Sequence, residues 1–337
     1  SNAKNPLIWA GGGVISGEAS KELTSLAEFL QAPVIATGEG RGAISDRSYL
    51  SIGSFRFKND TFFENKIQDY DLVVAVGTRL LNNQQLTGQK VLQIDIDDEE
   101  IGRNYDNTEG INGDAKKTLT EILNGLKSVM PPRESREEEL TKLKAERFNP
   151  GTVIEPQESF TKIIRSVMPD DGIFISGMTQ IGYYSRNKFE VYEPRTYITS
   201  SYYGNLGYAY PTALGAKVAQ PDKAVVAVCG DGGFMFNVQE LATAAKHHIN
   251  VVAVVFNDSA YGNVMRDQVN MFDGREYGAE VHNPDFMKLA EAFGVRGVRV
   301  EGGAPELGKA VQESLSIEAP TLIEVPVGPM PNPFRDY

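Results

Sequence analysis

Short apolar runs alternate with amphipathic segments along almost the whole chain, and this alternation limits the folds that it can adopt. The runs PLIWAGG, APVIAT, DLVVAVG and KVLQIDID have the composition of buried parallel strands. Between them, segments such as EASKELTSLAEFLQ place apolar residues on one helical face, here Leu23, Leu26, Ala27 and Leu30. Strands that alternate with helices in this way predict an α/β fold, in which parallel sheets are covered by helices on both faces.

The alternation is interrupted between residues 131 and 156. This stretch, PPRESREEELTKLKAERFNPGTVIEP, is rich in charge, bounded by prolines and poor in large apolar residues, which is typical of a connector with some helix. A chain of 337 residues is also too long for one ordinary core. We therefore predict two doubly wound domains, at 4–130 and 157–337, joined by a linker at 131–156.

Charge and cysteine content narrow the classes of partner. A formal net charge of −12 argues against nucleic acid or an anionic membrane as the main partner, although a surface feature for solubility explains it equally well. No apolar run reaches the ~18 residues needed to span a bilayer. The single cysteine, Cys229, excludes an internal disulfide and is typical of a reducing compartment, so we expect a cytoplasmic protein.

Two apolar runs in the second half end in polar residues. AVVAV leads into Gly230-Asp231-Gly232-Gly233, and NVVAVVF leads into Asn257-Asp258-Ser259-Ala260. Ligands bind at the carboxyl ends of strands in open parallel sheets, and one helix between these runs brings both ends to the same edge. We expect Asp231 and Asp258 to offer carboxylate oxygens to one cation, for which Mg²⁺ is the best match.

The glycines beside Asp231 favour an anionic ligand next to that cation. Gly230, Gly232 and Gly233 have no Cβ, so backbone N–H groups there can approach a phosphate closely. The alternative is that Asp231 and Asp258 only solvate loops or cap the following helices. For the GDG stretch alone that alternative is the better one, but the second aspartate at a neighbouring strand end favours a metal that holds a diphosphate.

These motifs resemble those of a known family. GDGG followed by FND is similar to the thiamine diphosphate fingerprint, usually written as GDG, about two dozen residues, then two asparagines. GGGVISGEASKELTSLAEFLQAPVIAT, VAVGTRL and VLQIDIDDEEIGRNY are similar to the middle domain of the acetolactate synthase group. GNLGYAYPTALGAKVA and NPDFMKLAEAFGVRGVRV are similar to its cofactor-binding domain. The resemblance extends from residue 5 to about 327 and implies a thiamine diphosphate- and Mg²⁺-dependent enzyme acting on a small-molecule 2-oxo acid.

The resemblance also implies individual roles at the diphosphate end. Asp231 and Asp258 would bind Mg²⁺ through their side chains and Ala260 through its carbonyl group. The family usually has asparagine at position 258, so the aspartate here keeps an oxygen ligand and adds negative charge near the diphosphate. Backbone contacts to the phosphates are implied for Gly232, Gly233, Tyr261 and Gly262, at the start of the helix YGNVMRDQ.

At the organic end of the cofactor, Gly204 and Leu206 match the place where the family supports the bent molecule. There a carbonyl accepts from the 4′-amino group and a bulky apolar side chain lies between the two rings; for Leu206 the alternative is an ordinary core leucine. The family offers Gln-His to the diphosphate where this chain reads SGMTQIG, which leaves Thr179 as the substitute.

Other implied features concern the complete protein. The family's activating glutamate belongs to an N-terminal pyrimidine-binding domain that this chain does not contain, so no catalytic residue is assigned and we expect the chain alone to be inactive. Because the family's cofactor lies between two subunits, we expect a homodimer or homotetramer. Met265 and Asp267 replace an Arg and a Trp of the acetolactate synthases, which argues against acetolactate synthesis itself. The alternative function is a non-catalytic cofactor-binding or assembly module.

The first apolar run suggests a second cofactor, in the first domain. Gly11-Gly12-Gly13 follows the first apolar run, as in dinucleotide-binding loops, but Ser16 occupies the third glycine position of G-x-G-x-x-G. Some relatives bind FAD in this domain and others keep it empty. We expect no FAD here and keep FAD as the alternative.

Overall fold

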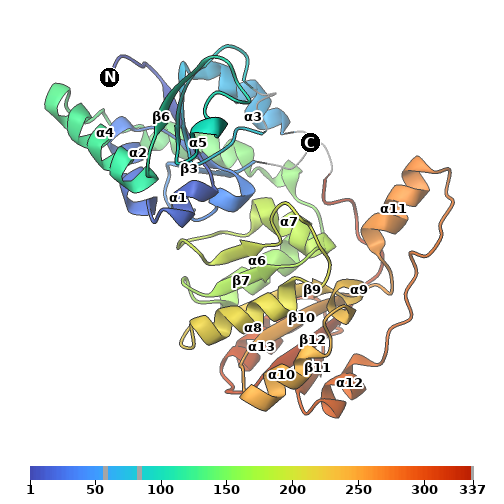
Figure 1. The fold of residues 1–337 in the computed structure, drawn as a ribbon. Helices are drawn as coiled ribbons and strands as arrows, with labels where there is room; N and C mark the ends of the chain where they lie inside the picture. The colour runs from blue at the N-terminus through green and yellow to red at the C-terminus, as the bar shows by residue number, and fades with distance from the viewer. Residues whose placement is uncertain (56–59, 82–85, 335–337) are drawn as a thin grey trace. The chain divides into compact units, whose positions relative to one another are not determined.

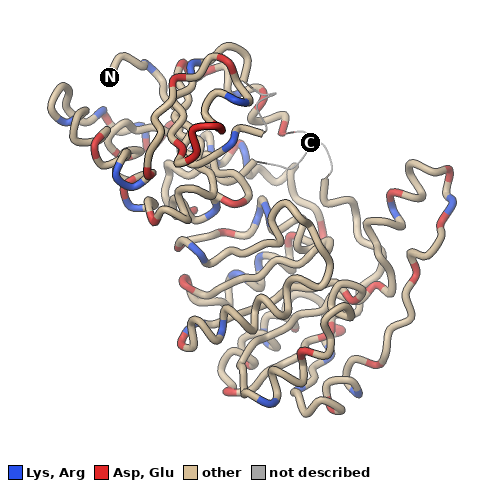
Figure 2. The backbone as a smooth tube through the Cα atoms, viewed as in Figure 1, with Lys and Arg blue, Asp and Glu red and all other residues tan. Residues whose placement is uncertain are grey.

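The computed structural model describes residues 1–55, 60–81 and 86–334, which form two compact units (Figure 1). Unit 1 comprises Ser1–Val153 together with Glu190–Arg195. Unit 2 comprises Ile154–Phe189 and the described chain from Thr196 on. Acidic and basic residues are interspersed over both units (Figure 2). Within the described ranges, no helix combines the length and the apolar character needed to cross a membrane.

Unit 1 is built on a parallel sheet with the strand order β3-β2-β1-β4-β5-β6. Its strands are β1 (Pro6–Ala10), β2 (Val34–Ala36), β3 (Ser51–Ser54), β4 (Leu72–Val76), β5 (Lys90–Asp95) and β6 (Thr108–Asn112). Its helices are α1 (Gly12–Ser16), α2 (Ser20–Leu30), α3 (Thr61–Lys66), α4 (Ala115–Val129) and α5 (Glu137–Arg147).

The central strand β1 shows why this sheet is covered on both faces. Ile8 and Ala10 lie in one buried cluster with residues of α2 and α4, such as Leu119. Leu7 and Trp9 lie in another, with Phe63 of α3. Successive residues of a strand point to opposite faces, so a strand that is apolar at every position needs a core on each side.

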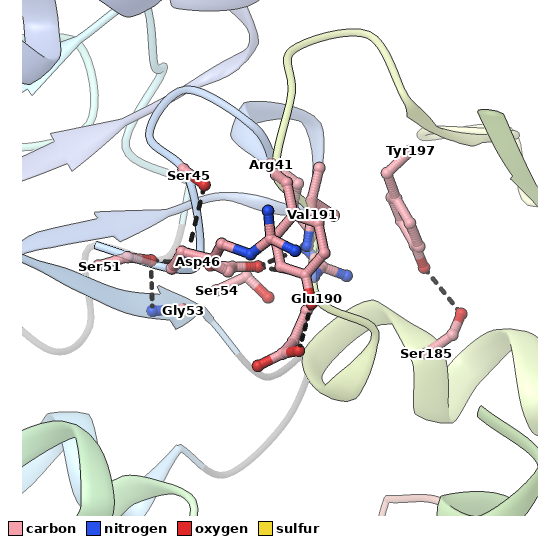
Figure 3. A network of polar contacts seen from close by, with 12 residues as sticks. Arg41, Ser45, Asp46, Ser51, Gly53, Ser54, Ser185, Glu190, Val191 and Tyr197 are labelled. Atoms are coloured by element: carbon pink, nitrogen blue, oxygen red, sulfur yellow. Dashed lines mark hydrogen bonds and ion pairs between the residues drawn. The ribbon is translucent and has the colours of Figure 1, made fainter. Parts of the chain in front are cut away.

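Two segments are fixed to unit 1 by buried polar contacts. The stretch 131–156, predicted as a linker, contains α5, whose Arg147 pairs with Asp60 at 2.8 Å while both side chains are buried. The segment Glu190–Arg195 is held through Asp46, which accepts from the Ser51 hydroxyl at 2.7 Å and the Val191 amide at 2.9 Å (Figure 3). These contacts explain why the first stretch, as far as Val153, and the segment Glu190–Arg195 belong to this unit.

Unit 2 has a second parallel sheet, with the order β11-β12-β10-β9-β7-β8. Its strands are β7 (Ile173–Ser176), β8 (Tyr197–Thr199), β9 (Val225–Gly230), β10 (Val252–Asn257), β11 (Arg296–Arg299) and β12 (Thr321–Pro326). Its helices are α6 (Gln157–Val167), α7 (Gln180–Lys188), α8 (Ala209–Ala219), α9 (Asp231–Met235), α10 (Glu240–His247), α11 (Gly262–Met271), α12 (Phe286–Ala292) and α13 (Ala304–Leu315). The predicted pair of parallel α/β sheets is confirmed.

The strand order of unit 2 determines where a ligand can bind. From β7 the chain connects first to β8 on one side and then to β9 on the other. Such a reversal leaves the carboxyl ends of the two central strands free of a crossing connection, and ligands of open parallel sheets bind there. A loop follows β7 from Gly177, and β9 runs directly into α9 at Asp231, so this edge carries the GDGG stretch.

Candidate metal and cofactor site

A cavity of about 240 Å³ opens at this carboxyl edge of the unit 2 sheet. Its lining brings together all the residues that the sequence analysis places on the cofactor and the metal. These are Thr179, Gly204, Leu206, Gly230, Asp231, Gly232, Gly233, Asp258, Ala260, Tyr261 and Gly262. They come from the carboxyl end of β9 and from the segments that follow β7, β8, β9 and β10, so four separate parts of unit 2 converge on one space.

Asp231 and Asp258 lie next to one another in this cavity. Asp231 is only 1% exposed, and burial raises its pKa even though Asn283 and backbone N–H groups donate to it. Burial, followed by the negative charge of Asp231, raises the pKa of Asp258 to about 6. Two neighbouring carboxyl groups that are hard to ionise together are the electrostatic signature of a site built for a cation.

The described residues supply no positive side chain to this pair. Neither aspartate has a lysine, arginine or histidine within 4.0 Å among the ion pairs of the described chain. Likewise, no cluster of three or more His, Cys, Asp or Glu side chains suited to a metal is found in the described ranges. The predicted ligands, two carboxylates and the carbonyl of Ala260, would fill half of the positions of an octahedral ion and leave the other half for further oxygen donors.

Two positions of the cavity lining, Gly232 and Gly262, have no room for a Cβ. A Cβ on Gly232 would lie 2.5 Å from the Tyr261 ring, and a Cβ on Gly262 would lie 2.6 Å from Oδ2 of Asp258. Gly262 is also the first residue of α11, and the next two residues, Asn263 and Val264, line the cavity with it. The N–H groups of a first helical turn have no intrahelical partner and favour anions.

The apolar wall of the cavity is provided by Leu206. This side chain is 36% exposed and lies on the cavity surface, unlike an ordinary core leucine. Gly204, two residues earlier, has φ +56°, a left-handed conformation that favours glycine. Thr179 is the N-cap residue of α7 and lies beside Gly230 in the same lining.

The structure also shows polar residues at the site that the sequence analysis does not identify. Asn283 donates to Oδ2 of Asp231 at 2.5 Å. Gln180 lines the cavity and accepts from Arg266 at 3.0 Å. Asn283 lies in an irregular segment before α12, far from the two motifs in sequence, so neither spacing nor periodicity could connect it to them. The only sequence signal for Gln180 is its place directly after a strand end.

Comparison with known families agrees with this geometry. Residues 177–325 match the thiamine pyrophosphate enzyme, C-terminal TPP binding domain, and residues 1–122 match the thiamine pyrophosphate enzyme, central domain. The chain belongs to the thiamine pyrophosphate enzymes. Thiamine pyrophosphate and thiamine diphosphate are two names for one molecule, so the predicted family is confirmed. The first match contains the cavity lining from Met178 to Val264, while Val327 and Met330 of the lining lie just beyond it.

Similar proteins among the thiamine pyrophosphate enzymes are named either acetolactate synthase or sulfoacetaldehyde acetyltransferase. The chain is 31% identical to the probable acetolactate synthase large subunit of Methanococcus aeolicus, over 98% of this chain and 59% of that protein. It is 32% identical to the acetolactate synthase large subunit of Corynebacterium glutamicum, over 97% and 55%. It is 29% identical to the sulfoacetaldehyde acetyltransferase of Castellaniella defragrans, over 96% and 61%. The chain thus spans little more than half the length of these relatives.

In unit 1, the glycine stretch that suggested a dinucleotide loop has a packing role. A Cβ on Gly11 would lie 2.1 Å from the carbonyl oxygen of Gly77, and a Cβ on Gly13 would lie 2.6 Å from the Gly77 Cα. Gly13 also donates its N–H to the Gly77 carbonyl at 3.0 Å. This close approach of two backbones explains Gly11 and Gly13 without any ligand.

Proposed function

We propose that this chain binds thiamine diphosphate through Mg²⁺ in the unit 2 cavity and serves an enzyme that acts on a 2-oxo acid. One observation carries the proposal: Asp231 and Asp258 meet at the ends of neighbouring strands, with no cationic side chain of the described residues beside them. A divalent ion would neutralise this pair and at the same time attract a diphosphate.

The residues of the cavity fit that group. The carboxylates of Asp231 and Asp258 and the carbonyl of Ala260 would hold the ion, and the donor set is all oxygen, as Mg²⁺ requires. Backbone N–H groups at Gly232, Gly233 and the start of α11 would receive the phosphates, because no Cβ narrows the space at Gly232 or Gly262. When bound, thiamine diphosphate supplies a carbon that adds to 2-oxo acids and accepts their electrons.

The chain's own part in such a reaction is to bind, orient and exclude water. Leu206 presents an apolar surface that would support the rings, and the left-handed turn at Gly204 sets the direction of the backbone before it. Tyr261 fills the space beside Gly232, which closes the cavity wall next to the metal ligands. These residues fix the cofactor's position, and positioning of a reactive group accounts for a large part of catalysis.

The class of reaction follows from the relatives and from departures on α11. Relatives named acetolactate synthase and sulfoacetaldehyde acetyltransferase support decarboxylation or carboligation of a 2-oxo acid as the activity. Met265 and Asp267 stand where acetolactate synthases carry Arg and Trp, so we propose an acceptor other than that of acetolactate synthesis. The complete protein is proposed to be a cytoplasmic homodimer or homotetramer, with the cofactor between subunits.

Titration calorimetry tests the cofactor and the metal together. We expect the 337-residue chain to bind thiamine diphosphate in the presence of Mg²⁺ and to lose this binding in EDTA. Asp231→Ala should remove binding in Mg²⁺, because one of the two carboxylates is then missing. No detectable association of the wild-type chain in Mg²⁺ would contradict the proposal.

Turnover is a separate expectation. Because the chain spans little more than half of its relatives and the activating glutamate is expected in the remainder, we expect cofactor binding without decarboxylation of pyruvate. Coupled assays with a panel of 2-oxo acids check this. Measurable turnover by the pure chain would show that it contains its own activating group.

A further inference from the structure

We propose that Asn283 is a positioning residue for the metal: its side-chain amide holds the carboxylate of Asp231 in the orientation in which it receives the ion. This inference rests on the proposed function and adds a residue to it. Asn283 lies in the segment between α11 and α12, outside both metal-binding stretches, and its Nδ2 donates to Oδ2 of Asp231 at 2.5 Å and to Oδ1 of Asn257 at 2.9 Å.

The orientation of the Asn283 amide follows from a chain of hydrogen bonds that begins at Glu324. Glu324 is 3% exposed and forms an ion pair with Arg299 at 2.8 Å, so its carboxylate can only accept. Asn257 must then direct its Nδ2 to Glu324, at 2.8 Å, and its Oδ1 away from it. That oxygen accepts from Asn283, which fixes the Nδ2 of Asn283 beside Asp231.

Asn257 connects the same chain to the second carboxylate. Its Oδ1 also accepts from the backbone N–H of Ser259 at 3.1 Å, within the loop that carries Asp258 and Ala260. One half-buried amide, that of Asn257, therefore connects to both sides of the candidate metal site: to Asp231 through Asn283, and to the Asp258 loop through Ser259. Residues that orient metal ligands in this way commonly set metal affinity without contacting the ion.

Backbone pairing keeps the Asn283 segment in place. Tyr261 N–H donates to the Ala279 carbonyl at 2.8 Å, and Val281 N–H donates to the Ser259 carbonyl at 2.9 Å. This short antiparallel pairing, with Ala260 opposite Glu280, lies beside the proposed carbonyl ligand. Asn283 therefore reaches Asp231 from a segment that is itself attached to the metal-binding loop.

The chemistry of an amide suits this role. A neutral donor occupies one lone pair of Asp231 and leaves its charge for the ion. An arginine or lysine in the same place would neutralise the carboxylate and compete with the ion. Removal of the amide should leave the charge of the site unchanged but free the carboxylate to rotate, which weakens metal binding.

Mn²⁺, titrated with thiamine diphosphate present and followed by electron paramagnetic resonance, tests the inference. We expect Asn283→Ala to weaken Mn²⁺ binding by about 10-fold, within the range known for such partners. The spectrum of bound Mn²⁺ should also broaden, because its ligand Asp231 is no longer fixed. Asn124→Ala, at an exposed position of α4 in unit 1, is the matched control and should keep the wild-type affinity and spectrum.

Thermal unfolding of the metal-free variants separates orientation from folding. We expect Asn283→Ala to melt within a few degrees of the wild type, so that its loss of affinity reflects the site. If Asn283→Ala binds Mn²⁺ with wild-type affinity, the inference is wrong while the proposed function stands. The same holds if the variant loses affinity with an unchanged Mn²⁺ spectrum and a large fall in melting temperature. A wild-type chain that binds no Mn²⁺ overturns the proposed function as well.

Discussion

At the scale of single residues, Asp258 has the clearest pH-dependent behaviour. Burial and the charge of Asp231 raise its pKa from 3.8 to about 6. Between about pH 4 and pH 6 the folded state therefore keeps a proton that the unfolded state has released. It follows that this group lowers the free energy of unfolding as pH rises through that window and has no further effect above it.

The variant Asp258→Asn isolates this effect in metal-free protein. Asparagine does not ionise, so the free energy of unfolding of the variant, relative to the wild type, should increase between about pH 4 and pH 6 and then stay constant. Urea unfolding in EDTA at several pH values measures the difference. A difference that is independent of pH would show that neither burial nor the charge of Asp231 raises the pKa of Asp258.

Asp258→Asn should weaken metal binding, although it should stabilise the metal-free chain relative to the wild type as pH rises. Asp258→Asn removes one negative charge beside the ion, and we expect Mn²⁺ to bind about 10-fold more weakly in the absence of diphosphate. Thiamine diphosphate, which is itself negative, should lose less affinity than the metal does. Calorimetry with each ligand measures both effects, and equal metal affinity in the two proteins would exclude a role for the second carboxylate.

Glycine substitutions offer a matched pair. A Cβ on Gly262 would lie 2.6 Å from Asp258 Oδ2, so Gly262→Ala should displace a metal ligand and abolish Mg²⁺-dependent cofactor binding. Gly215, on α8, has nothing within 4 Å of an added Cβ, and Gly215→Ala should stabilise the chain by about 0.5–1 kcal/mol without affecting binding. Calorimetry and urea unfolding check both, and normal binding by Gly262→Ala would contradict the geometry.

The thiol of Cys229 is a reactive type of side chain, but its buried position does not activate it. Cys229 lies on β9 directly before Gly230 and is 4% exposed. Burial raises the pKa of its thiol to about 12. A thiol that stays protonated is a poor nucleophile, so Cys229 is a core residue of the strand and not part of the chemistry.

At the scale of elements, the sequence predicts strands and helices with pronounced periodicity and misses those defined by tertiary contacts. The runs at β1, β4, β9 and β10 are apolar at nearly every position, so their burial could be predicted. Helix α9 could not, because Asp231, Gly232 and Gly233 are poor helix formers and are held by the surrounding fold. The polar residues at the strand ends could be predicted from the sequence. The contact of Asn283 with Asp231 could not, because a hydrogen bond between residues far apart in sequence leaves no sequence pattern.

Helix α5 offers a stability test at this scale. It is mostly charged and packs through Leu140, which is buried in the unit 1 core, and through Arg147, whose guanidinium pairs with Asp60 and donates to the Ser54 carbonyl at 2.6 Å. Arg147→Ala should cost about 3–5 kcal/mol, because it breaks an ion pair whose two side chains are both buried. In the ion pair that Arg103 makes with Glu100, the arginine side chain is 62% exposed, and Arg103→Ala should cost under about 1 kcal/mol. Similar losses of unfolding free energy in Arg147→Ala and Arg103→Ala, measured by urea unfolding, would show that burial does not strengthen the Arg147 ion pair.

At the scale of the whole chain, each unit has its own hydrophobic core, and we expect each to unfold cooperatively. Trp9 is the only tryptophan and is buried in unit 1, so its fluorescence reports that unit, while circular dichroism reports both. Thiamine diphosphate with Mg²⁺ should raise the unfolding temperature of unit 2 and leave the unfolding temperature of unit 1, measured by fluorescence, unchanged. A joint shift of both signals would show that the units unfold together.

The small segment Glu190–Arg195 has a consequence for how the protein is made. Unit 1 is discontinuous in sequence, because Val191 reaches Asp46 only after the chain has passed through α6, β7 and α7. On the ribosome, the earlier domain therefore cannot complete its native contacts until a good part of the later one has emerged. For the same reason, cutting the gene after Val153 would not yield two intact halves: the upstream product would lack the last piece of its own structure.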